Sequence, residues 1–162
     1  MAKILVNYYS RTGNTEKMAQ IIVEGVKSVK GVEVTLKKIE DTKPQEWLEY
    51  DAIILGSPVY YGAPAAEIKK AIDDSVKFHG KMKGKIGGAF ASSANIGGGN
   101  ETTIMDILHA WLIHGMIIQG DPIGDHYGPV AIGAPDERAK KNCLSYGKMI
   151  AELVLTCIIK KY

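Results

Sequence analysis

Cysteine is scarce in this chain, and its two cysteines are badly placed to form a bridge. Cys143 and Cys157 fall within one predicted helix, where a rise of about 1.5 Å per residue separates them by about 21 Å. A disulfide needs Cα atoms less than about 7 Å apart, so this pair cannot close one. Both residues lie on the apolar stripe of the helix, and we therefore expect buried, unreactive thiols.

Long hydrophobic runs and a strong charge are absent as well. No apolar segment approaches the roughly 18 residues of a membrane span. A net charge of +2 is too small to indicate nucleic acid binding. A predicted strand is reached by Ile4, which leaves no room for a signal peptide. We therefore expect one cytoplasmic domain over residues 1–162, with no membrane insertion and no nucleic acid partner.

Several catalytic and metal-binding motifs are missing too. The sequence has no Walker loop, no G-x-G-x-x-G after its first predicted strand and no G-x-S-x-G. Its first loop lacks the cysteine of a phosphatase, and the ends of the first and third strands lack the acids of a phosphoacceptor domain. His109 and His114 would point about 140° apart on a helix, so we expect no metal site.

The most informative stretch is a strand that turns through hydroxyl groups into a helix. An apolar run from Ile4 is rich in strand formers, and a helical pattern begins at Glu16. The free N–H groups and the dipole of a helix N-terminus favour an anion, and a glycine lets the backbone approach it. The alternative is an ordinary turn capped by Asn14 or Thr15. The residues of the predicted phosphate site are Ser10, Arg11, Thr12, Gly13, Asn14 and Thr15.

Strands and helices alternate along the rest of the chain. Further strands are predicted at residues 32–39, 51–56, 86–91 and 116–119, and the last helix at 136–160. This alternation predicts an α/β fold in which helices cover both faces of a five-stranded parallel sheet. The doubly wound order 2-1-3-4-5 suits that number of strands.

Two more loops rich in turn residues follow the third and fourth strands. In the predicted order these strands neighbour the first, so all three loops meet at one edge of the sheet. The second loop offers tyrosine rings for stacking, and the third offers hydroxyl, amide and backbone N–H groups. A phosphate at one end and a heterocycle at the other describe a mononucleotide, of which flavin mononucleotide (FMN) fits best. The residues are Pro58, Val59, Tyr60, Tyr61 and Gly62 in the second loop, and Ser92, Ser93, Asn95, Gly97, Gly98 and Gly99 in the third.

The same segments resemble the flavodoxin family. Residues 8–15 resemble its FMN-phosphate loop, and residues 57–62 resemble its second flavin loop. Residues 101–103 and 114–118 resemble, more narrowly, the tryptophan-repressor-binding-protein group of NAD(P)H:quinone oxidoreductases. This resemblance implies an FMN phosphate on residues 10–15, a ring between residues 58–62 and 92–99, and His114 as a catalytic residue near the substrate face.

Two functions are implied by the resemblance. We favour an FMN-dependent NAD(P)H:quinone oxidoreductase, whose partners would be NAD(P)H and a quinone; it is compatible with a homo-oligomer. The alternative is a flavodoxin-type protein that passes single electrons between partner proteins, since the phosphate loop is closer to plain flavodoxins. The mild positive charge departs from the acidity usual in flavodoxins. A flavin-binding regulatory module without turnover is a weaker third interpretation.

A basic connector precedes the fourth predicted strand. Four lysines lie between residues 77 and 85, where the chain enters that strand at its amino end. That end is far from the predicted cofactor site, about 16 Å along the strand. We therefore interpret the connector as a solvated turn rather than a docking surface.

Overall fold

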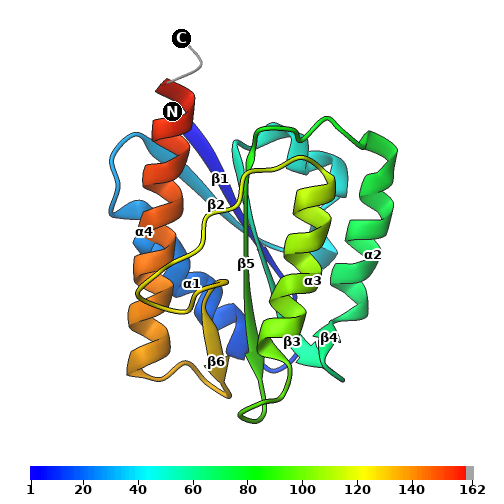
Figure 1. Ribbon diagram of the computed structural model, residues 1–162, viewed down its shortest axis with the longest axis vertical. Coiled ribbons are helices and arrows are strands. Elements are labelled where there is room, and N and C mark those ends of the chain that lie inside the picture. Colours follow the sequence, from blue (N-terminus) through cyan, green and yellow to red (C-terminus); the bar gives the residue numbers. More distant parts are fainter. Residues whose placement is uncertain (160–162) are drawn as a thin grey trace.

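A parallel sheet forms the middle layer of the protein, and the computed structural model describes residues 1–159 (Figure 1). The strands lie in the order β2-β1-β3-β5-β6, and each neighbouring pair is parallel. The short strand β4 (Ala63–Pro64) pairs antiparallel with the end of β3. With β4 set aside, this is the predicted order 2-1-3-4-5, which is confirmed. The parallel strands are β1 (Ala2–Tyr8), β2 (Val32–Lys38), β3 (Ala52–Tyr60), β5 (Ile86–Ser93) and β6 (Val130–Ile132).

The central strands are apolar because helices cover them on both faces. Every residue of β5 is buried, as are all of β1 except Lys3 and the first six of β3. The edge strand β2 is half-buried instead. Register places Tyr8 of β1 opposite Gly56 of β3, and Pro58 of β3 opposite Ser92 of β5. The carboxyl ends of these strands therefore meet at one edge of the sheet.

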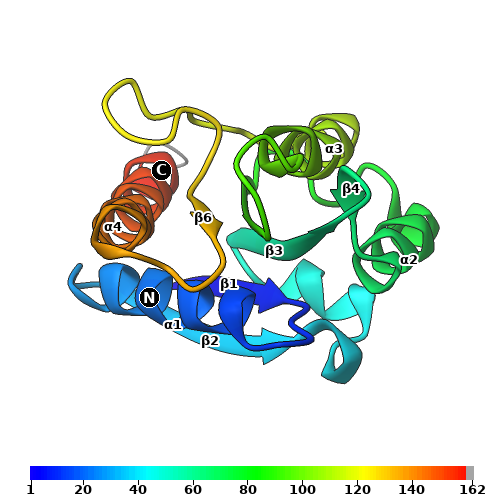
Figure 2. The ribbon, with the colours of Figure 1, turned by 90° about the horizontal axis from the view of Figure 1, so that it is seen from below.

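Helices lie in two outer layers (Figure 2). One core contains side chains of α1 (Asn14–Lys27) and α4 (Glu137–Ile159), packed on one face of the sheet. The other core contains side chains of α2 (Ala66–Asp74) and α3 (Asn100–Ile113), with the buried Trp47 and Trp111 in edge-to-face contact. Short 3₁₀ helices occupy connections, at Ile39–Asp41, Pro44–Glu49 and Ser75–Phe78.

The helices α1 and α4 touch through their backbones. A Cβ atom placed on Gly25 would lie 2.2 Å from the carbonyl oxygen of Leu144, and one on Gly147 would lie 2.1 Å from that of Ile22. No side chain larger than hydrogen fits at either point. The two glycines therefore fix the distance between the helix that follows the first loop and the last helix of the chain.

The fifth parallel strand lies later in the chain than predicted. Residues 116–119 form no regular strand, and Ile117 makes an isolated bridge with Ile86. The ladder with β5 runs instead through β6, where Ala91 pairs with Val130. The approach to β6 is fixed by Asp125, which accepts from the N–H of Val130 at 2.9 Å and from Arg138 at 2.6 Å. These contacts depend on tertiary structure, so hydrophobic periodicity alone did not reveal them.

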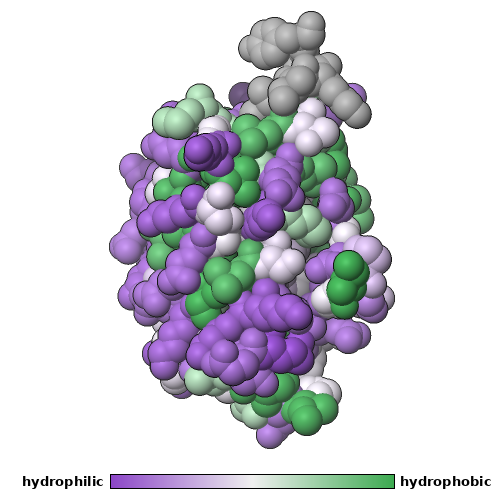
Figure 3. Space-filling model, turned by 90° about the vertical axis from the view of Figure 1, so that its left-hand side faces the viewer, coloured by the Kyte–Doolittle hydropathy of each residue, from purple (hydrophilic) through white to green (hydrophobic). Residues whose placement is uncertain are grey.

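The cysteine prediction holds for one of the two thiols. Cys143 is fully buried in α4, and burial raises its pKa to about 12, so the thiol stays protonated and unreactive. Cys157 is half-buried, contrary to expectation. Figure 3 views the side that carries α4, where hydrophilic side chains cover most of the surface and apolar ones are interspersed. Within residues 1–159, the helices are too short or too polar to cross a membrane.

Candidate functional site

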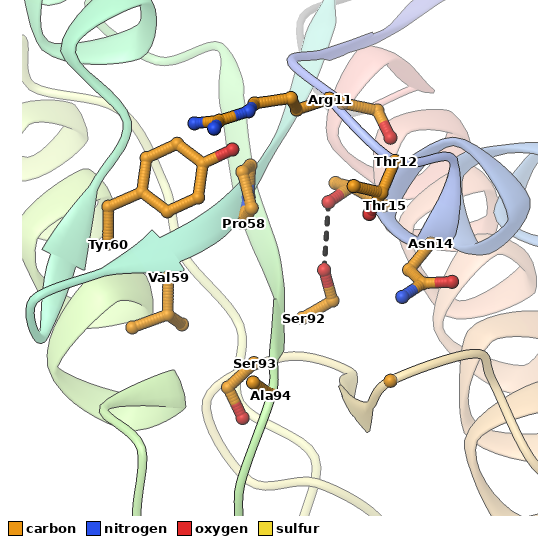
Figure 4. Close-up of a pocket in the computed structure, with 12 residues that line it drawn as sticks. Arg11, Thr12, Asn14, Thr15, Pro58, Val59, Tyr60, Ser92, Ser93 and Ala94 are labelled. Carbon is orange, nitrogen blue, oxygen red and sulfur yellow. Dashed lines mark hydrogen bonds between the residues drawn. The ribbon is translucent and has the colours of Figure 1, made fainter.

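A crevice opens at the carboxyl ends of β1, β3, β5 and β6. It encloses about 520 Å³, within the range of small-molecule sites. Figure 4 shows its walls, with residues of the first loop facing Tyr60 and Ser92 across the opening. The lining residues are Ser10, Arg11, Thr12, Asn14, Thr15, Pro58, Val59, Tyr60, Ser92, Ser93, Ala94 and Gly133.

The first loop presents backbone donors at the N-terminus of α1. Gly13 precedes the helix in a left-handed conformation, with φ at 94°, and space is open where a Cβ would lie. Ser10 Oγ accepts from the N–H groups of Gly13 and Glu16, at 3.1 and 3.2 Å. Within the described chain, nothing accepts from the N–H groups of Asn14 and Thr15, which the first helical turn leaves free. These two groups point their partial positive charge at the crevice.

Neither Asn14 nor Thr15 caps α1, contrary to the alternative of an ordinary turn capped by one of them. Asn14 and Thr15 lie inside the first turn of α1, and Gly13 in the N-cap position has no side chain to cap the helix. Thr15 is instead buried, and its hydroxyl lies 2.8 Å from that of Ser92 (Figure 4). This contact joins the first loop to the end of β5, so the donors of α1 keep a fixed place relative to the third loop.

The second loop is a tight hairpin between β3 and β4. Tyr60 pairs with Ala63, and the two residues between them, Tyr61 and Gly62, both have positive φ, at 52° and 78°. This is the geometry of a type I′ turn. Tyr60 lines the crevice, with the guanidinium carbon of Arg11 5.9 Å from its ring centroid (Figure 4). Tyr61 points into solvent and is fully exposed, so one of the two predicted stacking rings is on the crevice wall.

The third loop contributes two hydroxyl groups to the crevice, from Ser92 and Ser93. The Ser93 hydroxyl donates to the carbonyl of Asn95 at 2.8 Å, and that carbonyl also accepts from the N–H of Gly98. Asn95 and Gly98 line neither this crevice nor the neighbouring cavity of about 620 Å³. Gly97 and Gly99 line that second cavity, together with Ile96, Thr102, Ile132 and Arg138 among others.

Sequence reasoning missed two lining residues. Ala94 follows Ser93 directly, and its small side chain gave no signal. Gly133 directly follows β6, and its N–H donates to the carbonyl of Ser93 at 2.7 Å. A fifth strand predicted at the correct place would have put Gly133 at a carboxyl end beside the other loops. Its omission therefore follows from the misplaced strand.

His114 does not reach the crevice. It caps the C-terminus of α3, a helix of 14 residues that begins beside the third loop and ends about 21 Å away. There it is buried, with Nε2 2.7 Å from the hydroxyl of Ser75 and its ring stacked on Phe78. The predicted catalytic role of His114 at the substrate face is therefore not supported by the geometry of a single chain.

Comparisons with known proteins agree with this geometry. Residues 6–113 match the flavodoxin family. A flavodoxin of Aquifex aeolicus is 39% identical over 162 residues, which cover 95% of this chain and 88% of the relative. An NAD(P)H dehydrogenase (quinone) of Archaeoglobus fulgidus is 33% identical over 187 residues, with 94% and 97% covered. The solved structure of a flavodoxin, WrbA-like protein from Agrobacterium tumefaciens superposes with a TM-score of 0.81 at 27% identity, covering 96% and 99%.

The predicted resemblance is thereby confirmed at the level of fold and family. It covers the three loops that converge on the crevice, since the family match begins within β1 and ends within α3. The chain belongs to the flavodoxin family.

Proposed function

We propose that the crevice binds one FMN without a covalent bond and that the protein transfers electrons through it. One observation carries this proposal: free backbone donors at the N-terminus of α1 and an apolar wall ending in Tyr60 border the same cavity of about 520 Å³. An anion and an aromatic ring system on one molecule match these two surfaces. The cavity volume suits a ligand of mononucleotide size.

The residues of the crevice fit the parts of FMN. The N–H groups of Asn14 and Thr15 and the hydroxyl of Thr12 would hold the phosphate, with Arg11 adding a positive charge. Pro58, Val59 and Tyr60 would support the ring. At its polar edge Ser92 would donate or accept, and Ser93, whose hydrogen is donated to Asn95, would accept. When bound, FMN supplies the capacity to accept and release electrons. The remaining predicted residues Tyr61, Gly62, Asn95, Gly97, Gly98 and Gly99 belong to the loops behind these walls.

The geometry favours an electron carrier of the flavodoxin type as the more specific function. Of the twelve lining residues, Arg11 and Tyr60 are the ones with titratable side chains. No carboxylate, histidine or cysteine of the described chain borders the crevice, so Tyr60 is the lining side chain left that could donate or accept a proton there. A carrier needs no such acid or base, because its protein binds and orients the cofactor. A redox partner protein would then be the source and the acceptor of the electrons.

An NAD(P)H:quinone oxidoreductase is the second candidate. The relative from Archaeoglobus fulgidus that bears a quinone dehydrogenase name aligns over nearly its whole length. In that case NAD(P)H and a quinone would use the open side of the crevice in turn. The sequence-based preference for this function depended on residues 101–103, on residues 114–116 and on the absence of an acidic docking surface. Of these, His114 was the proposed catalytic residue, and it lies at the other end of α3. We therefore place the carrier first.

Two experiments test these proposals in sequence. Titration with FMN should quench its fluorescence with a one-to-one end point, and absence of binding at micromolar FMN would overturn the cofactor proposal. The loaded protein is then mixed in a stopped-flow instrument with NADH or NADPH, with and without benzoquinone. A carrier should show no rapid flavin bleaching by either nucleotide, and reductive titration should proceed in two one-electron steps. Fast bleaching with quinone-dependent recovery would instead establish the reductase.

A further inference from the structure

The tip of the β3–β4 hairpin is under strain that its own side chains do not relieve. Tyr61 has a left-handed backbone with φ at 52°, a conformation that costs energy for any residue except glycine. Its side chain is fully exposed and packs on nothing. Contacts made by neighbouring elements must therefore hold the turn in this shape.

Those contacts come from the start of α3. The hydroxyl of Thr102, in the first turn, donates to the carbonyl oxygen of Gly62 at 2.6 Å. The same hydroxyl lies 3.0 Å from the carbonyl of Gly99, one turn back in the chain. A threonine hydroxyl has one hydrogen, so the two acceptors compete, and the shorter contact is to Gly62. If the hairpin moved away, Gly99 would still accept the hydrogen bond.

The backbones of the two loops also approach closely at this point. A Cβ atom on Gly99 would lie 2.6 Å from the Cα of Gly62 and 3.2 Å from Cγ1 of Val59. Gly99 has φ at 108° and precedes α3, so glycine is required there for two reasons. The tip of the second loop therefore rests directly on the end of the third loop.

The contact between the hairpin tip and the start of α3 affects the crevice because the second and third loops both continue into the walls of the crevice. Val59 and Tyr60 lead from the crevice to the hairpin tip, and Ser92 and Ser93 lead from it to Gly99. The contact of Thr15 with Ser92 holds the third loop against the first, and the contact of Thr102 with Gly62 holds the second loop against the start of α3, which follows the third loop.

We propose that Thr102 is a positioning residue that latches the hairpin tip to α3 and so fixes the wall on which the flavin ring rests. The inference rests on the proposed FMN site and adds to it a residue outside the three predicted loops. Thr102 does not line the crevice, so its effect acts through Gly62 and Tyr60. Loss of the Thr102 hydroxyl should weaken binding of the flavin ring and leave binding of the phosphate at α1 unchanged.

The test compares Thr102→Val, which keeps the shape and removes the hydroxyl, with Thr102→Ser, which keeps the hydroxyl. Thr102 is exposed, so both variants should fold. FMN affinity is measured by fluorescence quenching, and inorganic phosphate is measured as a competitor of FMN. We expect Thr102→Val to weaken FMN about fivefold to tenfold, as loss of one hydrogen bond would. The affinity for inorganic phosphate should stay unchanged, and Thr102→Ser should match the wild type.

A control lies one residue further along the helix. Thr103 is buried, and within residues 1–159 its hydroxyl has no hydrogen-bond partner, so Thr103→Val should leave FMN affinity unchanged. Hydrogen exchange in the protein without FMN gives an independent readout: amides of residues 60–63 should exchange faster in Thr102→Val than in the control.

Each failure has a distinct meaning. Equal FMN affinity in Thr102→Val and wild type, unchanged exchange at the hairpin, or an equal loss of phosphate affinity would overturn the latch and leave the cofactor site standing. A wild-type protein that binds no FMN would overturn the proposed function, and this inference with it.

Discussion

The two ends of the sheet differ in whether their polar groups already have hydrogen-bond partners. At the carboxyl end, the first turn of α1 leaves the N–H groups of Asn14 and Thr15 without an acceptor in the described chain. At the amino end, side chains close the structure: Lys85 donates to the carbonyls of Leu48 and Tyr50, and His114 contacts Ser75. The carboxyl end therefore has backbone donors that could bind a ligand. At the amino end, these side chains already hydrogen-bond within the protein.

This difference teaches that a run of basic residues in the sequence is not by itself a fully exposed basic surface. The connector 77–85 is the densest positive run of the chain, yet one of its four lysines, Lys85, is half-buried and bonded to backbone carbonyls. The interpretation of the connector as a wholly solvated turn is wrong for that residue. The crevice has one arginine among its lining residues, and in our proposal backbone N–H groups supply most of the donors for the phosphate.

The comparison predicts that core substitutions at the amino end affect stability without affecting FMN affinity. Phe78 is buried beneath the ring of His114, so Phe78→Ala should lower the free energy of unfolding by about 3–5 kcal/mol. Urea unfolding measures this change, with the exposed Val76→Ala as a control of small effect. FMN affinity of the folded variant should equal that of the wild type, and a parallel loss of affinity would show that the two ends are coupled.

Substitution at the carboxyl end should have the reverse effect. Thr12→Glu places a carboxylate beside the proposed phosphate, and repulsion between the two anions should weaken FMN at least about a hundredfold. Stability should hardly change, because Thr12 is exposed and an acid near a helix N-terminus is favourable. The neutral Thr12→Gln serves as the matched control. If both variants bind FMN equally well, the phosphate does not lie at this loop.

The amino end should also contribute a moderate dependence of stability on pH. Burial lowers the pKa of His114, and the nearby His79 lowers it further. Because Ser75 donates to the carbonyl of Ile72, Nε2 of His114 must donate to Ser75; the buried Nδ1 then has no partner among residues 1–159. Protonation of Nδ1 is disfavoured in the folded state, so stability is full above about pH 6.5 and falls as the pH drops through the folded-state pKa.

Urea unfolding at pH 7.5 and pH 5.5 checks this expectation. His114→Gln should lose less stability between the two pH values than the wild type, while His109→Gln at an exposed position should behave as the wild type does. An equal decrease in all three proteins would assign the pH dependence to other groups.

The smallest effect is expected from the exposed part of the connector. Replacing Lys77, Lys81 and Lys83 together by glutamine should leave the reoxidation rate of the FMN-loaded protein by ferricyanide, and its salt dependence, unchanged. Arg11→Gln at the crevice is the comparison, and it should slow the reaction with this anion at low ionic strength. A triple variant as slow as Arg11→Gln would mean that the working face is not where we place it.

The sequence predicted the sheet order and the meeting of three loops because both follow from local pattern and from rules of chain connection. The apolar runs of β1, β3 and β5 and the helical spacing between them leave few arrangements. β6 was missed because its pairing depends on distant contacts: a Cβ on Gly128 would lie 2.1 Å from the carbonyl of Ala89, so that loop packs tightly on β5. Such packing leaves no periodic signal.

Some site residues could be placed from the sequence and others could not, because their orientation depends on the folded structure. Ser10–Thr15 and Pro58–Tyr60 sit where strands end, so their side of the sheet could be inferred. Tyr61 could not be oriented without knowing the turn type, which is set by two positive φ angles. His114 was assigned from resemblance alone, although the length of α3 would have placed it at the opposite end of the sheet.

The glycine contacts between α1 and α4 also order events during synthesis. Residues 10–15 leave the ribosome long before residues 137–159, whereas in the folded protein Gly25 of α1 packs on Leu144 of α4 and Gly147 of α4 packs on Ile22 of α1. A nascent chain that stops short of α4 lacks the support that aims the free N–H groups of Asn14 and Thr15. We therefore expect a ligand to bind at this loop only after the final helix has been translated and has packed against α1.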